Sequence, residues 1–247
     1  MSRPLPPPLR ENRAFAFAGE RVESARVVPA AEARRLLAAR NPTGRPNGDV
    51  LREFSGVAPD GGEVRRWAVD FPATMDEAER QLYVAPSAAV ARAGISPVNL
   101  QRNDALRNAL ARLERFLACP AAELQAGFAW VEGEVVPDDS LLVWARDDDF
   151  SAGVLASRVF AVWLSIGPPL AALLSFPFPW PPAAPLSALS REQEKQRFAL
   201  SRTARNADSA AIDDAVLRAY GWPADLTDDE IIARLRRLHQ ARSGKEA

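Results

Sequence analysis

The segment from Pro137 to Trp163 constrains the fold more than any other part of the chain. Leu141–Trp144 is an apolar run of strand length, and the acidic Asp147–Asp149 separates it from a largely apolar stretch at 151–166 that predicts a helix. A Gly-Pro-Pro triplet ends that helix, and the aromatic and proline-rich Phe176–Pro182 follows. A buried strand followed directly by an amphipathic helix predicts an α+β core.

Helical and strand-like patterns alternate along the rest of the chain. Helices are predicted at 29–40, 75–93, 103–118 and in three segments after Pro185, and strands at 65–71 and 128–131. Four leucines in 103–118, spaced by four, three and four residues, form an apolar stripe. The last helix is expected to begin with a capping box at Thr227–Glu230. We therefore expect an α+β fold in which small mixed sheets and packed helices are followed by a helical C-terminal appendage.

These patterns suggest three segments. Residues 1–19 form a proline-rich arm, which is either flexible or docked, 20–185 form the α+β domain, and 186–247 form the helical appendage. Cys119 is the single cysteine, so the chain has no internal disulfide and suits a reducing compartment. Residues 1–10 lack the apolar core of a signal peptide, and no apolar run is long enough to span a bilayer. We expect a cytoplasmic protein without membrane contact.

The overall charge argues against an avid, non-specific nucleic-acid binder. The chain has 31 basic and 32 acidic side chains, for a formal net charge of −1. Freestanding DNA-binding proteins usually carry a basic excess, although a local basic face is compatible with a neutral total.

The sequence lacks the motifs of the common catalytic centres. An adenine methyltransferase needs a glycine-containing loop for S-adenosylmethionine and an (Asn/Asp)-Pro-Pro-aromatic loop for the flipped base. Asn41-Pro42 is followed instead by Thr43-Gly44. His239 is the single histidine, so neither the usual zinc sites nor a Ser-His-Asp triad can be assembled. Asp147–Asp149 could hold Mg²⁺, but aspartates before a helix more often cap it. We predict no catalytic residue, metal or cofactor on this chain.

Several short motifs follow one another along the chain: Leu9–Asn12, Asn41–Arg52, Arg66–Phe71, Glu77–Tyr83, Pro137–Ser140, Ala145–Phe150, Gly153–Arg158, Phe176–Pro179 and Ala219–Pro223. In this order they resemble the C-terminal target-recognition region of MmeI-like class I N6-adenine DNA methyltransferases. The resemblance implies a recognition domain and helical tail of a restriction–modification or phage-defence system, without the catalytic core. It also implies that a partner methyltransferase core binds S-adenosylmethionine and flips the adenine of double-stranded DNA.

Two segments depart from that family. Relatives carry a basic, aromatic stretch before the Pro-Asp strand, whereas Ala118–Val131 is nearly uncharged here. Relatives also carry a threonine-bearing segment before Phe-Pro-Phe-Pro, whereas Gly167–Ser175 is short and apolar.

Five residues are the candidate DNA contacts. They are Arg45, Asn47, Arg65, Arg66 and Arg158. Arginine can bind guanine with two hydrogen bonds, and asparagine can do the same with adenine. The alternative is that the chain is a protein-interaction module, or a degenerate methyltransferase fragment that no longer binds DNA. A methyltransferase acting alone is a third hypothesis, which methyl transfer by the purified chain would support.

Overall fold

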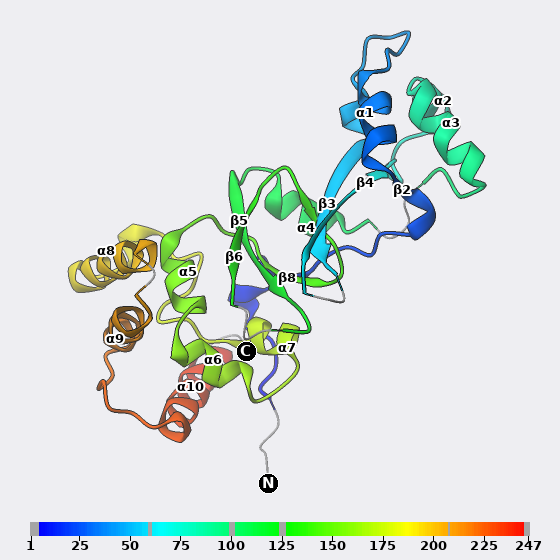
Figure 1. Ribbon diagram of the computed structural model, residues 1–247. Coiled ribbons are helices and arrows are strands. Elements are labelled where there is room, and N and C mark those ends of the chain that lie inside the picture. The colour runs from blue at the N-terminus through cyan, green and yellow to red at the C-terminus, as the bar shows by residue number, and fades with distance from the viewer. Residues whose placement is uncertain (1–4, 59–60, 99–101, 124–126, 207, 245–247) are drawn as a thin grey trace. The chain divides into compact units, whose positions relative to one another are not determined.

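The computed structural model describes residues 5–58, 61–98, 102–123, 127–206 and 208–244 (Figure 1). It confirms an α+β fold, because its described part contains both helices and two four-stranded sheets. Residues 1–4 of the predicted arm lie outside the described residues. The chain divides into two compact units, which are treated separately below. Unit 1 comprises Met1–Phe17, Leu113–Val131 and Leu142–Ala247, and unit 2 comprises Ala18–Arg112 and Glu132–Leu141.

The first sheet has the strand order β1-β8-β5-β6 and lies mainly in unit 1. Its strands are β1 (Ala16–Ala18), β5 (Arg115–Pro120), β6 (Ala129–Glu132) and β8 (Leu141–Trp144). The helices of unit 1 are α5 (Asp149–Leu155), α6 (Arg158–Leu164), α7 (Pro169–Ser175), α8 (Arg191–Arg205), α9 (Ser209–Tyr220) and α10 (Asp228–Ser243). The predicted strand at 141–144 and the three helices after Pro185 are therefore confirmed.

Aromatic side chains dominate the core of unit 1. The Trp144 ring stacks on Phe178 with 4.7 Å between centroids, and Phe176 packs edge-on against Phe178 at 5.0 Å. The Trp180 ring stacks on Phe150 at 4.9 Å. The Phe-Pro-Phe-Pro-Trp segment thus brings three large rings into one buried cluster, which removes much apolar surface from water.

The single helix predicted at 151–166 is two helices. Asp148 caps α5 by accepting a hydrogen bond from the backbone N–H of Ser151, which confirms that the acidic turn is a helix cap. The Ser157 hydroxyl donates to the Val154 carbonyl and accepts from the N–H of Phe160. These local bonds end α5 and begin α6, because a serine side chain competes with the helical ladder.

The helix predicted at 103–118 is wrong in its second half. Asp104–Leu110 forms α4, but Arg115–Pro120 is strand β5. Leu117 is buried in the aromatic core, and Cys119 is buried in the same strand. The leucine spacing fits a helix, yet pairing within the sheet overrides that local pattern, as is common for apolar segments of strand length.

Unit 2 contains the second sheet, with the strand order β2-β4-β3-β7. Its strands are β2 (Val27–Val28), β3 (Leu51–Val57), β4 (Glu63–Val69) and β7 (Val136–Pro137), and its helices are α1 (Ala30–Ala38), α2 (Glu77–Gln81), α3 (Val84–Ala93) and α4 (Asp104–Leu110). β3 and β4 are antiparallel, and β7 runs parallel to β3 at Phe54 and Ser55. Trp67, Val69 and Phe71 face one core, as their spacing predicts.

The helix predicted at 75–93 is also divided, into α2 and α3. Pro86 lies in the first turn of α3, where its missing N–H costs nothing. In the middle of one long helix the same proline would remove a backbone hydrogen bond, so the chain begins a new helix before it.

The predicted segments 1–19, 20–185 and 186–247 do not coincide with the compact units. Residues 5–17 dock within unit 1, where Leu9 is fully buried and the Asn12 amide donates to the carbonyls of Leu173 and Phe176. Helices α8–α10 belong to the same unit. Among the described residues, no helix combines the length and apolar character needed to cross a membrane.

Candidate nucleic-acid interface

Arg45 lies at the tip of the turn that follows α1. Gly44 has the positive φ of 74° that this turn needs, and its N–H donates to the Asn41 carbonyl. The Arg45 side chain is 45% exposed, and its Nη1 lies 3.7 Å from Oε1 of Glu79, which is itself 45% exposed. An exposed pair at this distance is weak, and Arg45 also interacts with the hydroxyl of Tyr83.

Asn47 is completely buried, which conflicts with the predicted base contact. Its Nδ2 donates to the carbonyls of Leu36 (2.7 Å) and Ala39 (2.9 Å). Its Oδ1 accepts from Asn41 Nδ2 at 2.6 Å. The side chain therefore holds the end of α1 against the next turn, and in this conformation no DNA base can reach it.

Arg65 and Arg66 are neighbours on β4 and point to opposite faces of the sheet. Arg65 pairs with Glu63 at 2.8 Å and with Glu132 at 3.3 Å. The hydrogen bond that Arg65 donates to Glu63 raises the pKa of Arg65 despite partial burial. Arg66 pairs with the buried carboxylate of Asp138.

Asp138 explains the Pro-Asp-Asp-Ser motif. Its Oδ1 accepts from the N–H of Ser140 at 3.0 Å and from the Ser140 hydroxyl. Gly56 lies on β3, and a Cβ at this position would overlap the Asp138 carboxylate. Only glycine therefore leaves room there for the ion pair between Asp138 and Arg66. The motif and Arg66 thus have a structural role inside unit 2.

Arg158 belongs to unit 1, whereas the other four candidates belong to unit 2. Its guanidinium pairs with Asp228 at 2.5 Å, and its backbone N–H donates to Asp213 at 2.7 Å. These contacts tie the start of α6 to α9 and α10. Within unit 2, the structure places Arg45 and Asn47 in one turn and Arg65 and Arg66 on one strand.

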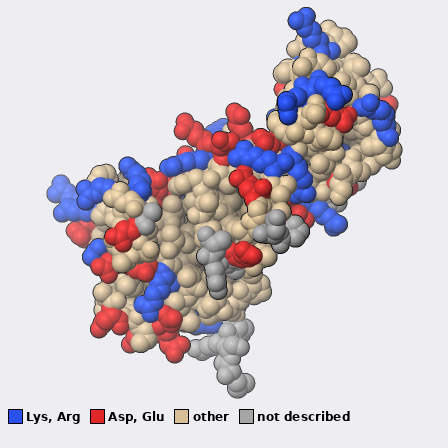
Figure 2. All heavy atoms as spheres, in the orientation of Figure 1, with Lys and Arg blue, Asp and Glu red and all other residues tan. Residues whose placement is uncertain are grey.

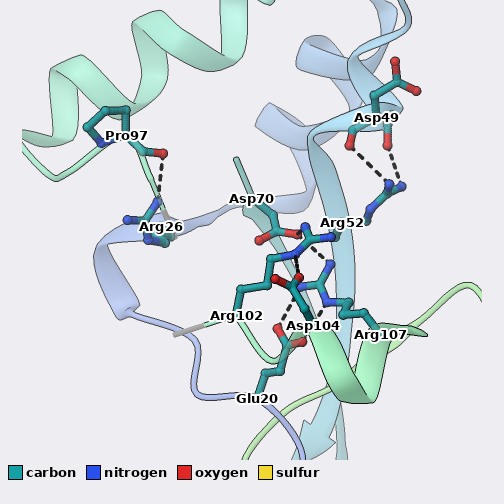
Figure 3. Close-up of polar contacts among 10 residues, drawn as sticks. Glu20, Arg26, Asp49, Arg52, Asp70, Pro97, Arg102, Asp104 and Arg107 are labelled. Atoms are coloured by element: carbon teal, nitrogen blue, oxygen red, sulfur yellow. Dashed lines mark hydrogen bonds and ion pairs between the residues drawn. The ribbon is translucent and has the colours of Figure 1, made fainter. Parts of the chain in front are cut away.

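An arginine–carboxylate network fills the space between β3, β4 and α4 (Figure 3). Arg107 binds both oxygens of Glu20, at 2.7 and 2.8 Å, and Asp70 at 2.6 Å. Arg102 joins Asp70 at 3.0 Å, and the Arg107 guanidinium lies 5.6 Å from the centroid of the Phe54 ring. Burial lowers the pKa of Arg107, but the hydrogen bonds to Glu20 and the charge of Asp70 outweigh it and raise the pKa.

A groove of about 600 Å³ runs beside β3 in unit 2. Its charged lining residues are Arg52, Arg102, Arg107, Glu53, Glu132 and Glu134. Arg102 and Arg107 are occupied by the network. The Arg52 guanidinium instead donates to the backbone carbonyls of Gly48 (2.7 Å) and Asp49 (3.2 Å), and within the described part of the chain it forms no ion pair with a carboxylate.

Arg52 is therefore the cation of the groove that gains most from an incoming anion. Burial, together with the charges of Arg107 and Arg102, lowers its pKa, while Asp70 and Asp49 act in the opposite direction. A phosphate oxygen placed against Arg52 would relieve that repulsion. The sequence analysis missed this residue because Arg52 gains its significance from Arg102 and Arg107, which lie about fifty residues away in the chain.

The described residues contain no group of three His, Cys, Asp or Glu side chains suited to a metal ion. Burial raises the pKa of the Cys119 thiol to about 12, so the thiol is protonated at neutral pH. His239 is buried, with Nε2 2.8 Å from the Pro7 carbonyl and its ring stacked near Trp163.

The fold is similar to that of a known restriction–modification enzyme. The Type IIL restriction-modification enzyme MmeI, solved in complex with DNA, superposes with a TM-score of 0.55 at 14% sequence identity. The alignment covers 99% of this chain and 37% of that chain. No protein-family model matches the chain, and the comparison with curated proteins gives no significant match. At this identity the likeness shows a shared fold, and the chain spans little more than a third of that enzyme's length.

Proposed function

We propose that the chain is the DNA target-recognition module of an N6-adenine DNA methyltransferase system and is non-catalytic by itself. The observation that carries the proposal is the fold likeness, which extends over 99% of the chain, to an enzyme solved with DNA bound. The order of the sequence motifs supports it independently, because they resemble the recognition region of the same enzyme class.

The roles of the residues follow from their availability. Arg52 in the groove and Arg45 at the exposed turn contact DNA phosphates and fix the register of the module on the duplex. A partner methyltransferase core binds S-adenosylmethionine and flips the adenine, which matches the lack of catalytic motifs on this chain.

Selection from a random duplex library tests this proposal. The full chain is expected to enrich one common sequence at low salt. Enrichment of no shared sequence would contradict the recognition role and favour a protein-interaction module. Incubation with S-adenosylmethionine alone is expected to leave the selected duplex unmethylated.

Substitution of Arg52 then tests the groove. Because one phosphate contact is lost, Arg52→Gln is expected to reduce the slope of log affinity against log salt by about 0.9. The matched control is Arg92→Gln on α3, whose side chain is 70% exposed and pairs only at the surface with Glu32. Equal slopes for the two variants would exclude Arg52 as a phosphate contact.

A further inference from the structure

Helix α8 presents a continuous basic face with one aromatic residue at its centre. The face consists of Arg191, Lys195, Phe198, Arg202 and Arg205, all of which are exposed. Their spacing of four, three, four and three residues confines them to about 80° of the helix circumference, since each residue turns by about 100°. We call this set the basic face of α8.

The opposite side of α8 anchors the helix in unit 1. Leu200 is fully buried in the aromatic core, and a Cβ at Gly153 of α5 would lie only 2.9 Å from its methyl group. Ser190 and Gln193 form a capping box at the N-terminus. The basic face is therefore carried by a rigid element and is not a tail that changes its shape freely.

Two of the four cations on this face are uncommitted. Arg191 and Arg202 form no ion pair or hydrogen bond with any residue that the structure describes. Lys195 reaches Glu192 at 4.0 Å, where both side chains are strongly exposed. Arg205 pairs with Asp149 at 2.6 Å, but Asp149 also binds Arg115 at 2.9 Å. Figure 2 shows Lys and Arg side chains gathered over α8, in the orientation of Figure 1.

Phe198 is an exposed aromatic residue on an otherwise charged helix face. Its side chain is 68% exposed, more than any other exposed large hydrophobic residue that the structure describes. A large ring in water costs free energy unless a partner covers it. Cations that flank an exposed aromatic ring form the combination that grips a nucleic-acid strand, through phosphate contacts and stacking or sugar contacts.

We propose that the basic face of α8 binds the phosphodiester backbone of DNA outside the recognised sequence. The inference rests on the proposed function and assigns it a second contact surface, in unit 1. The face extends for about 21 Å along the helix at 1.5 Å per residue. The phosphates of a DNA strand repeat regularly, at about one per 3.4 Å of helix axis, so a row of cations can face a regular series of anions.

Two other anionic partners fit the face less well. A membrane surface would receive only one apolar side chain, whereas interfacial helices insert an apolar face. An acidic protein would present irregular charge, which does not require four cations in one line. Both partners remain outcomes of the test below.

The test compares full-length variants by fluorescence anisotropy at several salt concentrations. The probes are the duplex selected as above, a scrambled duplex and a single strand of the same length. Arg191→Gln/Arg202→Gln is expected to lower the salt slope by about 1.8, because two phosphate contacts are lost, and to weaken binding to both duplexes equally. The matched control is Arg218→Gln/Arg237→Gln, which removes two exposed arginines of α9 and α10.

Phe198→Ala separates the aromatic contribution from the charges. If the ring stacks on an unpaired base, binding to the single strand falls at least about fivefold and Phe198→Leu does not restore it. An equal loss on duplex and single strand assigns the ring to sugar contacts along either form of the backbone. No loss with any probe contradicts a role for Phe198.

The outcomes distinguish this inference from the proposed function. A wild-type chain that binds both duplexes alike, with a smaller salt slope for the double variant, refutes sequence recognition but upholds the α8 contact. Overturning results are an unchanged slope in the double variant, or a wild-type chain that binds no DNA. Preferential binding to poly-glutamate or to phosphatidylserine vesicles would assign the face to an acidic protein or a membrane and would also overturn the inference.

Discussion

The two compact units use opposite means to specify their interiors. Unit 1 buries stacked aromatic rings around Trp144, Trp163 and Phe178. Unit 2 has a smaller apolar core and encloses the carboxylates of Glu20, Asp70 and Asp138, each paired with arginine. Apolar packing is non-directional, whereas a buried carboxylate needs its partner in one place. Unit 1 should therefore lose stability when a buried apolar side chain is shortened, and unit 2 when one charge of a buried ion pair is removed.

The same contrast affects which arginines can meet DNA. In unit 2 most of the arginines that sequence reasoning selects are held by carboxylates, and Arg52 is left beside the groove. In unit 1, Arg191 and Arg202 on the exposed face of α8 form no ion pair with any described residue. Abundant arginine in a sequence thus says little about binding until its partners are known.

Trp163→Ala should cause the largest loss and should act on unit 1. Trp163 is fully buried, contacts Phe176, and donates from Nε1 to the Ala172 carbonyl at 3.1 Å. The cavity and the lost hydrogen bond predict a decrease of about 4–5 kcal/mol in the free energy of unfolding. Urea denaturation measures it, with exposed Phe198→Ala expected to stay within about 0.5 kcal/mol.

Arg107→Met should cause the next largest loss and should act on unit 2. The substitution keeps apolar volume but leaves Glu20 and Asp70 buried with fewer cations, which predicts a loss of about 3–4 kcal/mol. Hydrogen exchange should show the loss first in β3 and β4. The exposed pair Arg92–Glu32 provides the control, since Arg92→Met should lower the free energy of unfolding by at most about 0.5 kcal/mol. A small effect of Arg107→Met would mean that charge pairing does not specify unit 2.

Asn47→Ala should cost about 2 kcal/mol, because the carbonyls of Leu36 and Ala39 lose their donor inside the protein. Thermal unfolding measures the loss. Under conditions where the variant is folded, its preference among DNA sequences should equal that of the wild type. A changed base preference with unchanged stability would restore the base contact inferred from sequence.

The smallest effect concerns the cap of α10. The N–H and the hydroxyl of Thr227 donate to Glu230 and lower its pKa from the usual 4.5. A lowered pKa in the folded state stabilises the protein above pH 4.5, and this contribution is lost as the pH falls through the folded value. The unfolding temperature of wild type should therefore drop more steeply below pH 4.5 than that of Glu230→Gln. Asp225→Asn, outside the helix, should follow the wild-type curve.

Local signals in the sequence predict the elements that depend on local chemistry. The turn at Gly44, the cap at Asp148, the capping box at Thr227 and the buried strand Leu141–Trp144 all follow from a few adjacent residues. The predictions that fail concern elements that depend on residues far apart in the chain. Arg115–Pro120 is a strand because it pairs within a sheet, although its leucine spacing favours a helix.

The candidate site depends even more on distant residues. Glu20 and Arg107 are 87 positions apart, and no spacing rule links them. The basic face of α8 is a different case, since its period is visible in the sequence. Which face of α8 is exposed becomes clear only when Leu200 is found in the core.

The most direct measurement is the affinity of the purified full chain for the selected duplex and for its scrambled counterpart at one physiological salt concentration. Sequence recognition predicts that the selected duplex binds at least about a thousandfold more tightly. Equal affinities at that salt concentration would contradict the central claim that this fold recognises a DNA sequence.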